Sequence, residues 1–179
     1  MLLKILIVLA VIVVVFVVIV ASRPGEFRVT RSAAINASPD TVFNQVNDLH
    51  KWEAWSPWAK MDPAAKTSYE GPPTGVGSSF AWAGNSRIGE GRMTITDSRP
   101  AELVRFRLDF LKPFKGTNVA EFGFKAKDGQ TEVTWTMSGA NNFLTKAFQM
   151  FVDCEKMVGG QFEQGLADMK TIAEREARK

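Results

Sequence analysis

Residues 103–110 read LVRFRLDF, and this stretch decides the fold class. Apolar side chains occupy every second position from Val104 to Phe110, and arginine or aspartate occupies each position between them. Successive side chains of a β-strand point to opposite faces, so the alternation predicts a strand with one covered face and one face in water. One-sided strands of this kind build antiparallel sheets.

The same alternation recurs before and after this strand. Residues 27–35, 119–126 and 131–138 each place apolar side chains on one face, and shorter versions begin at Ser79 and around Met93. Asp128-Gly129 separates the last two long segments and is typical of a hairpin turn. We therefore expect an antiparallel sheet, with Arg31 as the one break in the alternation of its first strand.

Along the chain, a short helix is expected after the first strand and a long helix after the last strand. The SPD triplet at residues 38–40 begins a short one, because it combines a hydroxyl cap, a proline in the first turn and an acidic residue. A long helix is expected from Asn141 or Asn142 to about Glu176. The apolar stripe that would cover the sheet consists of Leu144, Phe148, Phe151, Val158, Phe162, Leu166, Met169 and Ala173.

Two features of this long helix do not fit a simple core stripe. Gly159 and Gly160 lie in its middle, where each glycine costs about 1 kcal/mol relative to alanine. Glu155 lies at the centre of the stripe, where a charge is costly unless it is paired or hydrated. Glu155 would either meet a ligand or act as an acid or base in a cavity. The alternative, which we favour, pairs it with an arginine of the sheet or turns it outward at the glycines.

The first 21 residues differ from everything that follows. Lys4 is their only polar residue. A helix that begins at Leu2 and ends at Ala21 is about 30 Å long, which matches the hydrocarbon core of a bilayer. A cleaved signal peptide is the alternative, but the apolar run is too long and its end is a poor cleavage site. We expect a single-pass anchor in the cell membrane.

The rest of the chain divides into a linker, residues 22–26, and one domain, residues 27–179. The short linker holds the domain close to the bilayer. Arg23, Arg28 and Arg31 follow the span, whereas only Lys4 precedes it. Positive charges favour the cytoplasmic side, so we expect the domain there.

Composition excludes several classes of protein. The 179 residues carry a formal net charge of +3 and one cysteine, so the chain is not a disulfide scaffold, a disordered chain or a strongly basic nucleic-acid binder. A single histidine, His50, and a single cysteine, Cys154, provide neither a metal site nor a catalytic triad. We therefore expect no metal, no cofactor and no nucleic-acid partner. We interpret His50 as an exposed residue at a helix end and Cys154 as a small buried side chain.

Three motifs, taken in order, resemble a known family. They are SPxxVF at residues 38–43, WxxWSPW at residues 52–58 and GxxFExGLxxMK at residues 159–170. Together they resemble the SRPBCC, or START-like, proteins of the polyketide cyclase/dehydrase and lipid transport family. The resemblance implies an α+β helix-grip fold, in which a curved antiparallel sheet wraps around a long C-terminal helix and encloses an apolar cavity. It also implies binding of hydrophobic small molecules, with catalysis in a minority of members.

Aromatic side chains are the strongest sign of a binding site. Beyond the first segment the chain carries twelve phenylalanines and five tryptophans, more than a single core needs. They would line a pocket for an apolar ligand, and a filled core is the alternative. The expected cavity residues are Trp52, Trp55, Trp58, Phe80, Trp82, Met93, Phe106, Phe110, Phe122, Phe124, Trp135, Met137, Phe151 and Glu155.

Three functions remain open at this point. The leading hypothesis is a membrane-anchored carrier or sensor of a hydrophobic small molecule or lipid, with Trp52, Trp55 and Trp58 framing the opening of the cavity. The second is a cyclase, dehydratase or hydrolase, which requires at least two polar groups converging in the cavity. The third is an interaction module, which requires a filled pocket and joint exposure of these three tryptophans.

Overall fold

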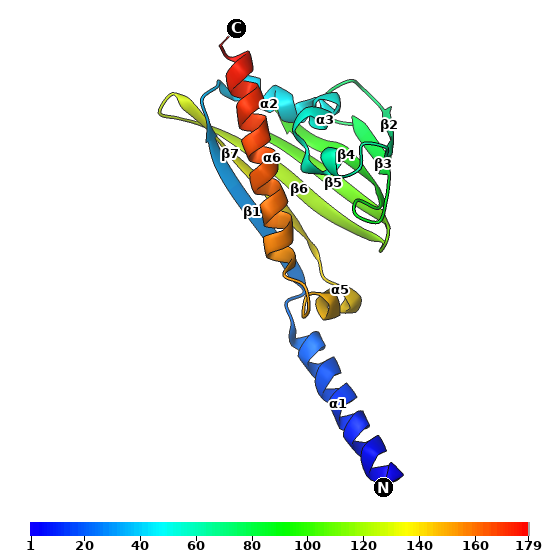
Figure 1. Ribbon diagram of the computed structural model, residues 1–179. Coiled ribbons are helices and arrows are strands. Elements are labelled where there is room, and N and C mark those ends of the chain that lie inside the picture. Colours follow the sequence, from blue (N-terminus) through cyan, green and yellow to red (C-terminus); the bar gives the residue numbers. More distant parts are fainter. Residues whose placement is uncertain (179) are drawn as a thin grey trace.

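The computed structural model describes residues 1–178, and within them seven strands form one antiparallel sheet (Figure 1). The strand order is β1-β7-β6-β5-β4-β3-β2. The strands are β1 (Glu26–Ile35), β2 (Lys66–Glu70), β3 (Ser79–Ala83), β4 (Glu90–Arg99), β5 (Leu103–Lys112), β6 (Gly116–Lys127) and β7 (Gln130–Ala140). The alternation predicted every strand except β2, whose residues are polar and exposed throughout.

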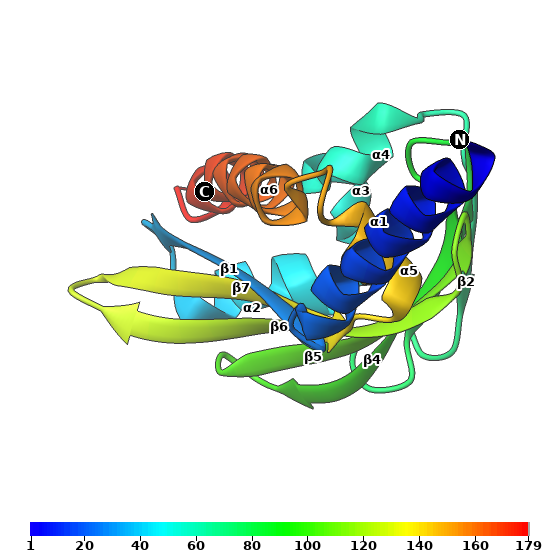
Figure 2. The ribbon, with the colours of Figure 1, turned by 90° about the horizontal axis from the view of Figure 1, so that it is seen from below.

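The helices lie mainly on one side of the sheet (Figures 1 and 2). They are α1 (Leu2–Ser22), α2 (Pro39–Asn47), η1 (Leu49–Lys51), α3 (Trp52–Trp55), α4 (Pro57–Met61), α5 (Phe143–Phe148) and α6 (Cys154–Glu176). The long helix α6 packs along β1 and against α2, α3 and α4. The fold is therefore the expected α+β helix-grip arrangement, a curved antiparallel sheet with a long C-terminal helix.

The two faces of the sheet follow the alternation of residues 103–110. Phe106 is completely buried on the concave face, and Phe122 of the neighbouring strand is buried beside it. Arg105 lies on the opposite face and binds Glu121 at 2.8 Å between Nη2 and Oε2. The β6–β7 turn at Asp128-Gly129 has positive φ at both residues, as the predicted tight hairpin requires.

The helix α2 begins where the SPD triplet predicts. The Oγ of Ser38 accepts a hydrogen bond from the backbone N–H of Thr41 at 3.2 Å and caps the helix. The helix buries Val42, Phe43 and Val46 against one end of the concave face. It thereby fills that end of the sheet with apolar side chains.

The expected helix from Asn141 or Asn142 to Glu176 is wrong in one respect: it is two helices. Asn142 caps α5 through Thr145, and Asp153 separately caps α6 through Lys156. Two N-caps cannot belong to one continuous helix, because each cap side chain replaces the backbone hydrogen bond of a preceding turn. Only the part of the stripe within α6 covers the sheet, and its Phe162, Leu166, Met169 and Ala173 are buried whereas Leu144, Phe148 and Phe151 are exposed.

The apolar helix α1 extends away from the domain (Figure 1). By length and composition it is able to cross a membrane. It contacts the domain at α5, and Val20 is its one buried residue. The linker after α1 is held against the domain, because the N–H of Asn141 donates a hydrogen bond to the carbonyl of Gly25 at 2.8 Å.

Candidate functional site

A cavity of about 610 Å³ lies between the concave face of the sheet and the helices α3, α4 and α6. Its volume falls within the range of pockets that bind small organic molecules, roughly 300–1,000 Å³. Most of the wall is apolar. Its large apolar side chains are Leu49, Trp52, Trp58, Phe80, Trp82, Ile88, Met93, Leu108, Phe110, Trp135, Met137, Val158 and Phe162.

Eight of the fourteen expected residues line this cavity. The strands provide most of them, because inward positions recur at every second residue of β3, β4, β5 and β7. The remaining two come from α3 and α4. The eight are Trp52, Trp58, Phe80, Trp82, Met93, Phe110, Trp135 and Met137.

Four expected residues point inward but do not reach the cavity. Trp55, Phe106, Phe122 and Phe124 are at most 7% exposed and belong to the packed end of the concave face. The physical reason is α2, which covers that end: the ring of Phe43 meets the ring of Phe124 at 5.7 Å in an edge-on arrangement. These four residues are core rather than wall.

Phe151 is the clearest misplaced residue of the predicted site. Its side chain is 79% exposed and lies in the turn between α5 and α6, outside the cavity. The expectation assumed a continuous helix, in which residue 151 falls on the same stripe as Phe162. Because the helix is interrupted, the helical spacing does not carry through to residue 151.

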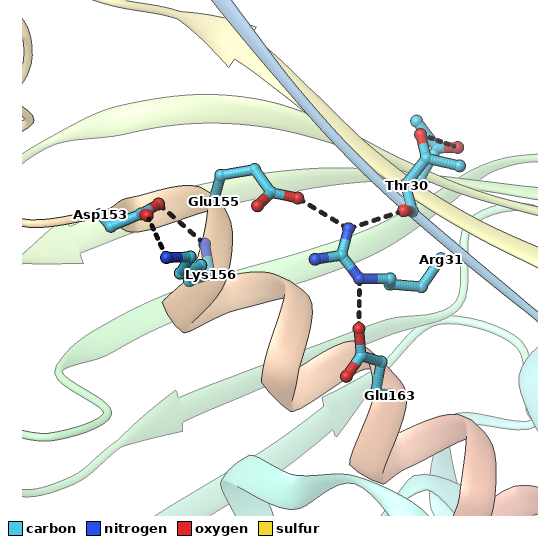
Figure 3. Close-up of polar contacts among 7 residues, drawn as sticks. Thr30, Arg31, Asp153, Glu155, Lys156 and Glu163 are labelled. Atoms are coloured by element: carbon cyan, nitrogen blue, oxygen red, sulfur yellow. Dashed lines mark hydrogen bonds and ion pairs between the residues drawn. The ribbon is translucent and has the colours of Figure 1, made fainter.

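Glu155 also lies outside the cavity, and the paired alternative is confirmed (Figure 3). Arg31 donates from Nη1 to Glu155 at 2.7 Å and from Nε to Glu163 at 2.6 Å. These two hydrogen bonds raise the pKa of the Arg31 guanidinium. Arg31 breaks the alternation of β1 because its side chain reaches across to α6.

Gly159 explains how Arg31 reaches both carboxylates. A Cβ at residue 159 would collide with the guanidinium of Arg31, so the arginine can cross α6 only where the helix has no side chain. Gly160 faces open space instead. The two adjacent glycines therefore differ: the first makes room for an ion pair, and nothing in the structure explains the second.

The tryptophans of α3 are anchored to α2 and do not frame the opening. The indole N–H of Trp52 donates to the carbonyl of Val46 at 2.9 Å, and that of Trp55 donates to the carbonyl of Gln45 at 3.1 Å. Trp52 is only 8% exposed, and Trp55 is fully buried. The expected opening is wrong for Trp52 and Trp55, because their hydrogen bonds to α2 hold both rings inside the domain, whereas Trp58 is half-buried and lines the cavity. The joint exposure that an interaction module requires is also absent from residues 52–58.

Trp135 occupies the boundary between the packed end and the cavity. Its ring stacks on Phe162 with centroids 4.0 Å apart and on Phe122 with centroids 4.6 Å apart. Its Nε1 is buried, and among the described residues it has no hydrogen-bond partner. A buried N–H without a partner is costly, so this residue is held in place by ring packing.

Tyr69 is a wall residue that the sequence did not reveal. It lies on the unpredicted strand β2, where it pairs with Phe80, and its ring stacks on His50 with centroids 4.0 Å apart. Burial raises the pKa of the Tyr69 phenol, and the nearby carboxylates of Glu53 and Asp48 raise it further. The phenol is therefore a neutral hydrogen-bond donor at physiological pH. Tyr69 could not be predicted as a wall residue because β2 has no apolar alternation.

The lone histidine and the lone cysteine take no part in the wall. His50 is exposed, as interpreted, and lies in η1, where its Nδ1 is 3.2 Å from Asp48. Cys154 is half-buried at the start of α6, where burial and then Asp153 raise the pKa of its thiol. A raised pKa leaves less of the reactive thiolate, which argues against a nucleophile.

The exposed part of the wall lies at three places. One, which we call the mouth, consists of Ser86 and Arg87 in the β3–β4 turn and Lys112 and Pro113 at the end of β5. The second consists of Glu53, Thr67 and Tyr69, between α3 and the edge strand, and the third of Lys60 and Pro63, at the end of α4 and just after it. Each is a route by which a molecule could reach the cavity.

The mouth faces the end of the sheet from which α1 leaves. The pairs Lys112–Glu90 and Glu90–Ala83 end their strands there, as the pair Glu26–Ala140 does at the other edge of the sheet. Because neighbouring antiparallel strands share their ends, these strand ends lie along one border of the sheet.

Comparison with known proteins identifies the family that has this architecture. The model of the family described as polyketide cyclase/dehydrase and lipid transport matches residues 26–174. The chain belongs to this family. The match covers the whole sheet, the cavity and nearly all of α6. None of the curated proteins matches the chain in sequence.

Several solved structures share the fold of this chain, although their sequence identity to it is low. A protein of unknown function from Staphylococcus aureus is 13% identical, with a TM-score of 0.62 over 86% of this chain and 97% of its own. The Aha1 dimer from Colwellia psychrerythraea is 17% identical, with a TM-score of 0.60 over 83% and 96%. DynU16, from the dynemicin biosynthetic locus, is 14% identical, with a TM-score of 0.56 over 84% and 48%. At these identities the likeness is one of fold.

Proposed function

We propose that the protein is a membrane-anchored carrier or sensor that binds a hydrophobic small molecule or a lipid in the cavity. The observation that carries the proposal is an apolar cavity of about 610 Å³ whose mouth lies at the end of the sheet from which α1 leaves. Membership of the polyketide cyclase/dehydrase and lipid transport family supports the binding of a hydrophobic molecule. Apolar walls favour an apolar ligand, because burying each Å² of such surface contributes about 25 cal/mol.

Anchoring of the domain by α1 is the second part of the proposal. The helix has 21 residues, and a span of the hydrocarbon core takes about 20. On the cytoplasmic side, the orientation we propose, Arg23 and Arg28 would lie close to the bilayer. Arg31 no longer supports this orientation, since its charge is paired with Glu155 and Glu163.

An enzyme acting on the same molecule is the less supported alternative. It would require polar groups that converge on the ligand, but three of the five charged wall residues have other partners. Lys60 binds Asp168 at 2.7 Å, and Lys112 binds Glu90 at 2.7 Å. The carboxylate of Asp62 accepts the N–H of Asn85 at 2.7 Å. These contacts favour binding without catalysis.

The proposal is tested by filling the cavity. Ala120 lines the cavity on β6, whereas the adjacent Val119 points to the outer face. We expect the purified full-length protein to release a hydrophobic molecule on solvent extraction, detected by mass spectrometry, and Ala120→Leu to retain at least about tenfold less of it. Val119→Leu is the matched control and should retain as much as the unchanged protein. Equal retention by both variants, or no ligand in any of them, would contradict the proposal.

A further inference from the structure

Outside α1, most exposed large apolar side chains gather at one end of the domain. They are Leu111 and Phe114 near the β5–β6 turn, Phe143, Leu144 and Phe148 on α5, Phe151 after α5, and Met157 in the first turns of α6. Phe151 at 79%, Phe114 at 69% and Leu144 at 68% are the most exposed of them. This is the end from which α1 leaves, next to α5 (Figure 1). Exposed apolar clusters of this kind mark interaction surfaces.

Three hydrogen bonds hold α5 at the end of α1. Asn141 donates from its N–H to Gly25 at 2.8 Å and from Nδ2 to Pro24 at 3.3 Å. Lys146 on α5 donates from Nζ to the carbonyl of Ala21 at 3.4 Å. If α1 spans a bilayer, these contacts place α5 at the depth of its last turn, which is the headgroup region.

The helix α5 has the composition of a helix that lies in a membrane surface. At 100° per residue, Phe143, Leu144 and Phe148 fall within an arc of about 140°, and Lys146 lies outside that arc. An apolar arc beside a basic residue is typical of interfacial helices. Arg87 and Lys115, in turns at the same end, form no ion pair within residues 1–178 and are available to anionic headgroups.

We propose that α5, the turn after it and Phe114 of the β5–β6 turn make a second contact with the lipid surface, an inference that rests on the proposed anchoring by α1. The lipid-facing patch consists of Phe114, Phe143, Leu144, Phe148 and Phe151. A single span attaches the domain to the bilayer at one point, whereas a second contact fixes the tilt of the domain relative to the bilayer. The mouth then faces the bilayer, and a hydrophobic molecule passes between lipid and cavity without crossing water.

Site-specific quenching tests this contact in the full-length chain. In a Cys154→Ser background, Leu144→Cys and Phe151→Cys would each carry a polarity-sensitive fluorophore in vesicles of phosphatidylcholine with a minority of phosphatidylglycerol. Val76→Cys is the matched control, because Val76 is also apolar and 58% exposed but lies away from α1, next to α2. We expect aqueous iodide to quench the labels at 144 and 151 at least about fivefold less than the label at 76, and lipids with a nitroxide near the headgroup to quench them strongly.

A label introduced by Ile12→Cys in the middle of α1 separates the two proposals. If nitroxides on the acyl chains do not quench it, the anchoring fails and the second contact fails with it. If they do quench it while iodide reaches positions 144, 151 and 76 equally, the anchoring stands and the patch proposal is overturned. Labels at 144 and 151 that are shielded from iodide but not quenched by the headgroup nitroxide would show that a second copy of the chain covers the patch, which also overturns the proposal.

Discussion

The two ends of the concave face are built from the same kind of residue and reach different outcomes. Phe106 and Phe110 lie on the same strand and the same face, four residues apart. Phe106 is completely buried and meets Trp52 edge-on at 5.3 Å, whereas Phe110 meets Trp82 at 6.0 Å and lines the cavity. The difference shows that an inward-facing aromatic becomes core or wall according to what covers it.

The covering element at the packed end is α2 with its neighbour α3. The indoles of Trp52 and Trp55 reach back to carbonyls of α2, which joins these short helices into one cover. At the other end α4 and the first half of α6 close the wall without filling the space. One sheet therefore carries a solid core and a binding cavity side by side.

Truncation of the two phenylalanines should have the largest effect and tests the comparison directly. We expect Phe106→Ala to lower the free energy of unfolding by about 3–5 kcal/mol, because it opens a void in a packed core. Phe110→Ala removes a side chain that already borders empty space and should cost about 1–2 kcal/mol. Denaturant titration of the full-length protein in detergent measures both. Equal losses would mean that the two ends are packed alike.

Substitution of glycines in α6 should change the free energy of unfolding by a smaller amount. It tests the boundary between the packed end of the concave face and the cavity. A Cβ at Gly165 would lie 2.9 Å from the Trp135 ring and 3.2 Å from Pro57, two groups that cannot easily move. Gly165→Ala should therefore lower the free energy of unfolding by about 1–3 kcal/mol. Gly160→Ala is the matched control, and it should raise this free energy by up to about 1 kcal/mol because its Cβ would meet nothing. Thermal unfolding followed by circular dichroism distinguishes the two signs.

Titration of the Tyr69 phenol, at an exposed side of the cavity, should show the smallest and most local effect. The chain has one tyrosine, so phenolate absorbance reports this residue alone. Because its pKa is raised in the folded protein, the native titration midpoint should lie above the value near 10 of the unfolded chain. The corresponding stability is present below pH 10 or so and is lost as the pH rises through the folded pKa. A native midpoint at or below that of the denatured chain would place the phenol in water.

The sequence predicted the parts of this protein that depend on local periodicity. Alternation at residues 103–110 and in five further segments predicted six of the seven strands, and the triplet at residues 38–40 predicted the start of α2. Strand β2 and its Tyr69 were missed because an edge strand exposed on all its residues has no apolar pattern. Residue 151 was misplaced because two capped helices carry the same apolar residues as one long helix would.

Contacts between distant elements were beyond the reach of the sequence. In the sequence, Arg31 breaks the alternation of β1, and Glu155 is a charge within an apolar stripe for which we favoured an arginine partner or an outward position. Together with Glu163 they form one ion-pair cluster that joins strand and helix 124 and 132 residues apart in the chain. A partner could be expected for Glu155, but its identity required the crossing of β1 and α6 at Gly159.

By itself, then, the sequence determined which side chains of the strands face inward and that the first helix is apolar enough to span a bilayer, because both depend on spacing and composition along the chain. Tertiary structure alone decided which inward side chains meet a neighbour. The helix α2 fills one end of the concave face, and no helix fills the other, so identical aromatic residues become core at one end and cavity wall at the other. That distinction depends on packing in three dimensions, which no periodicity in the chain records.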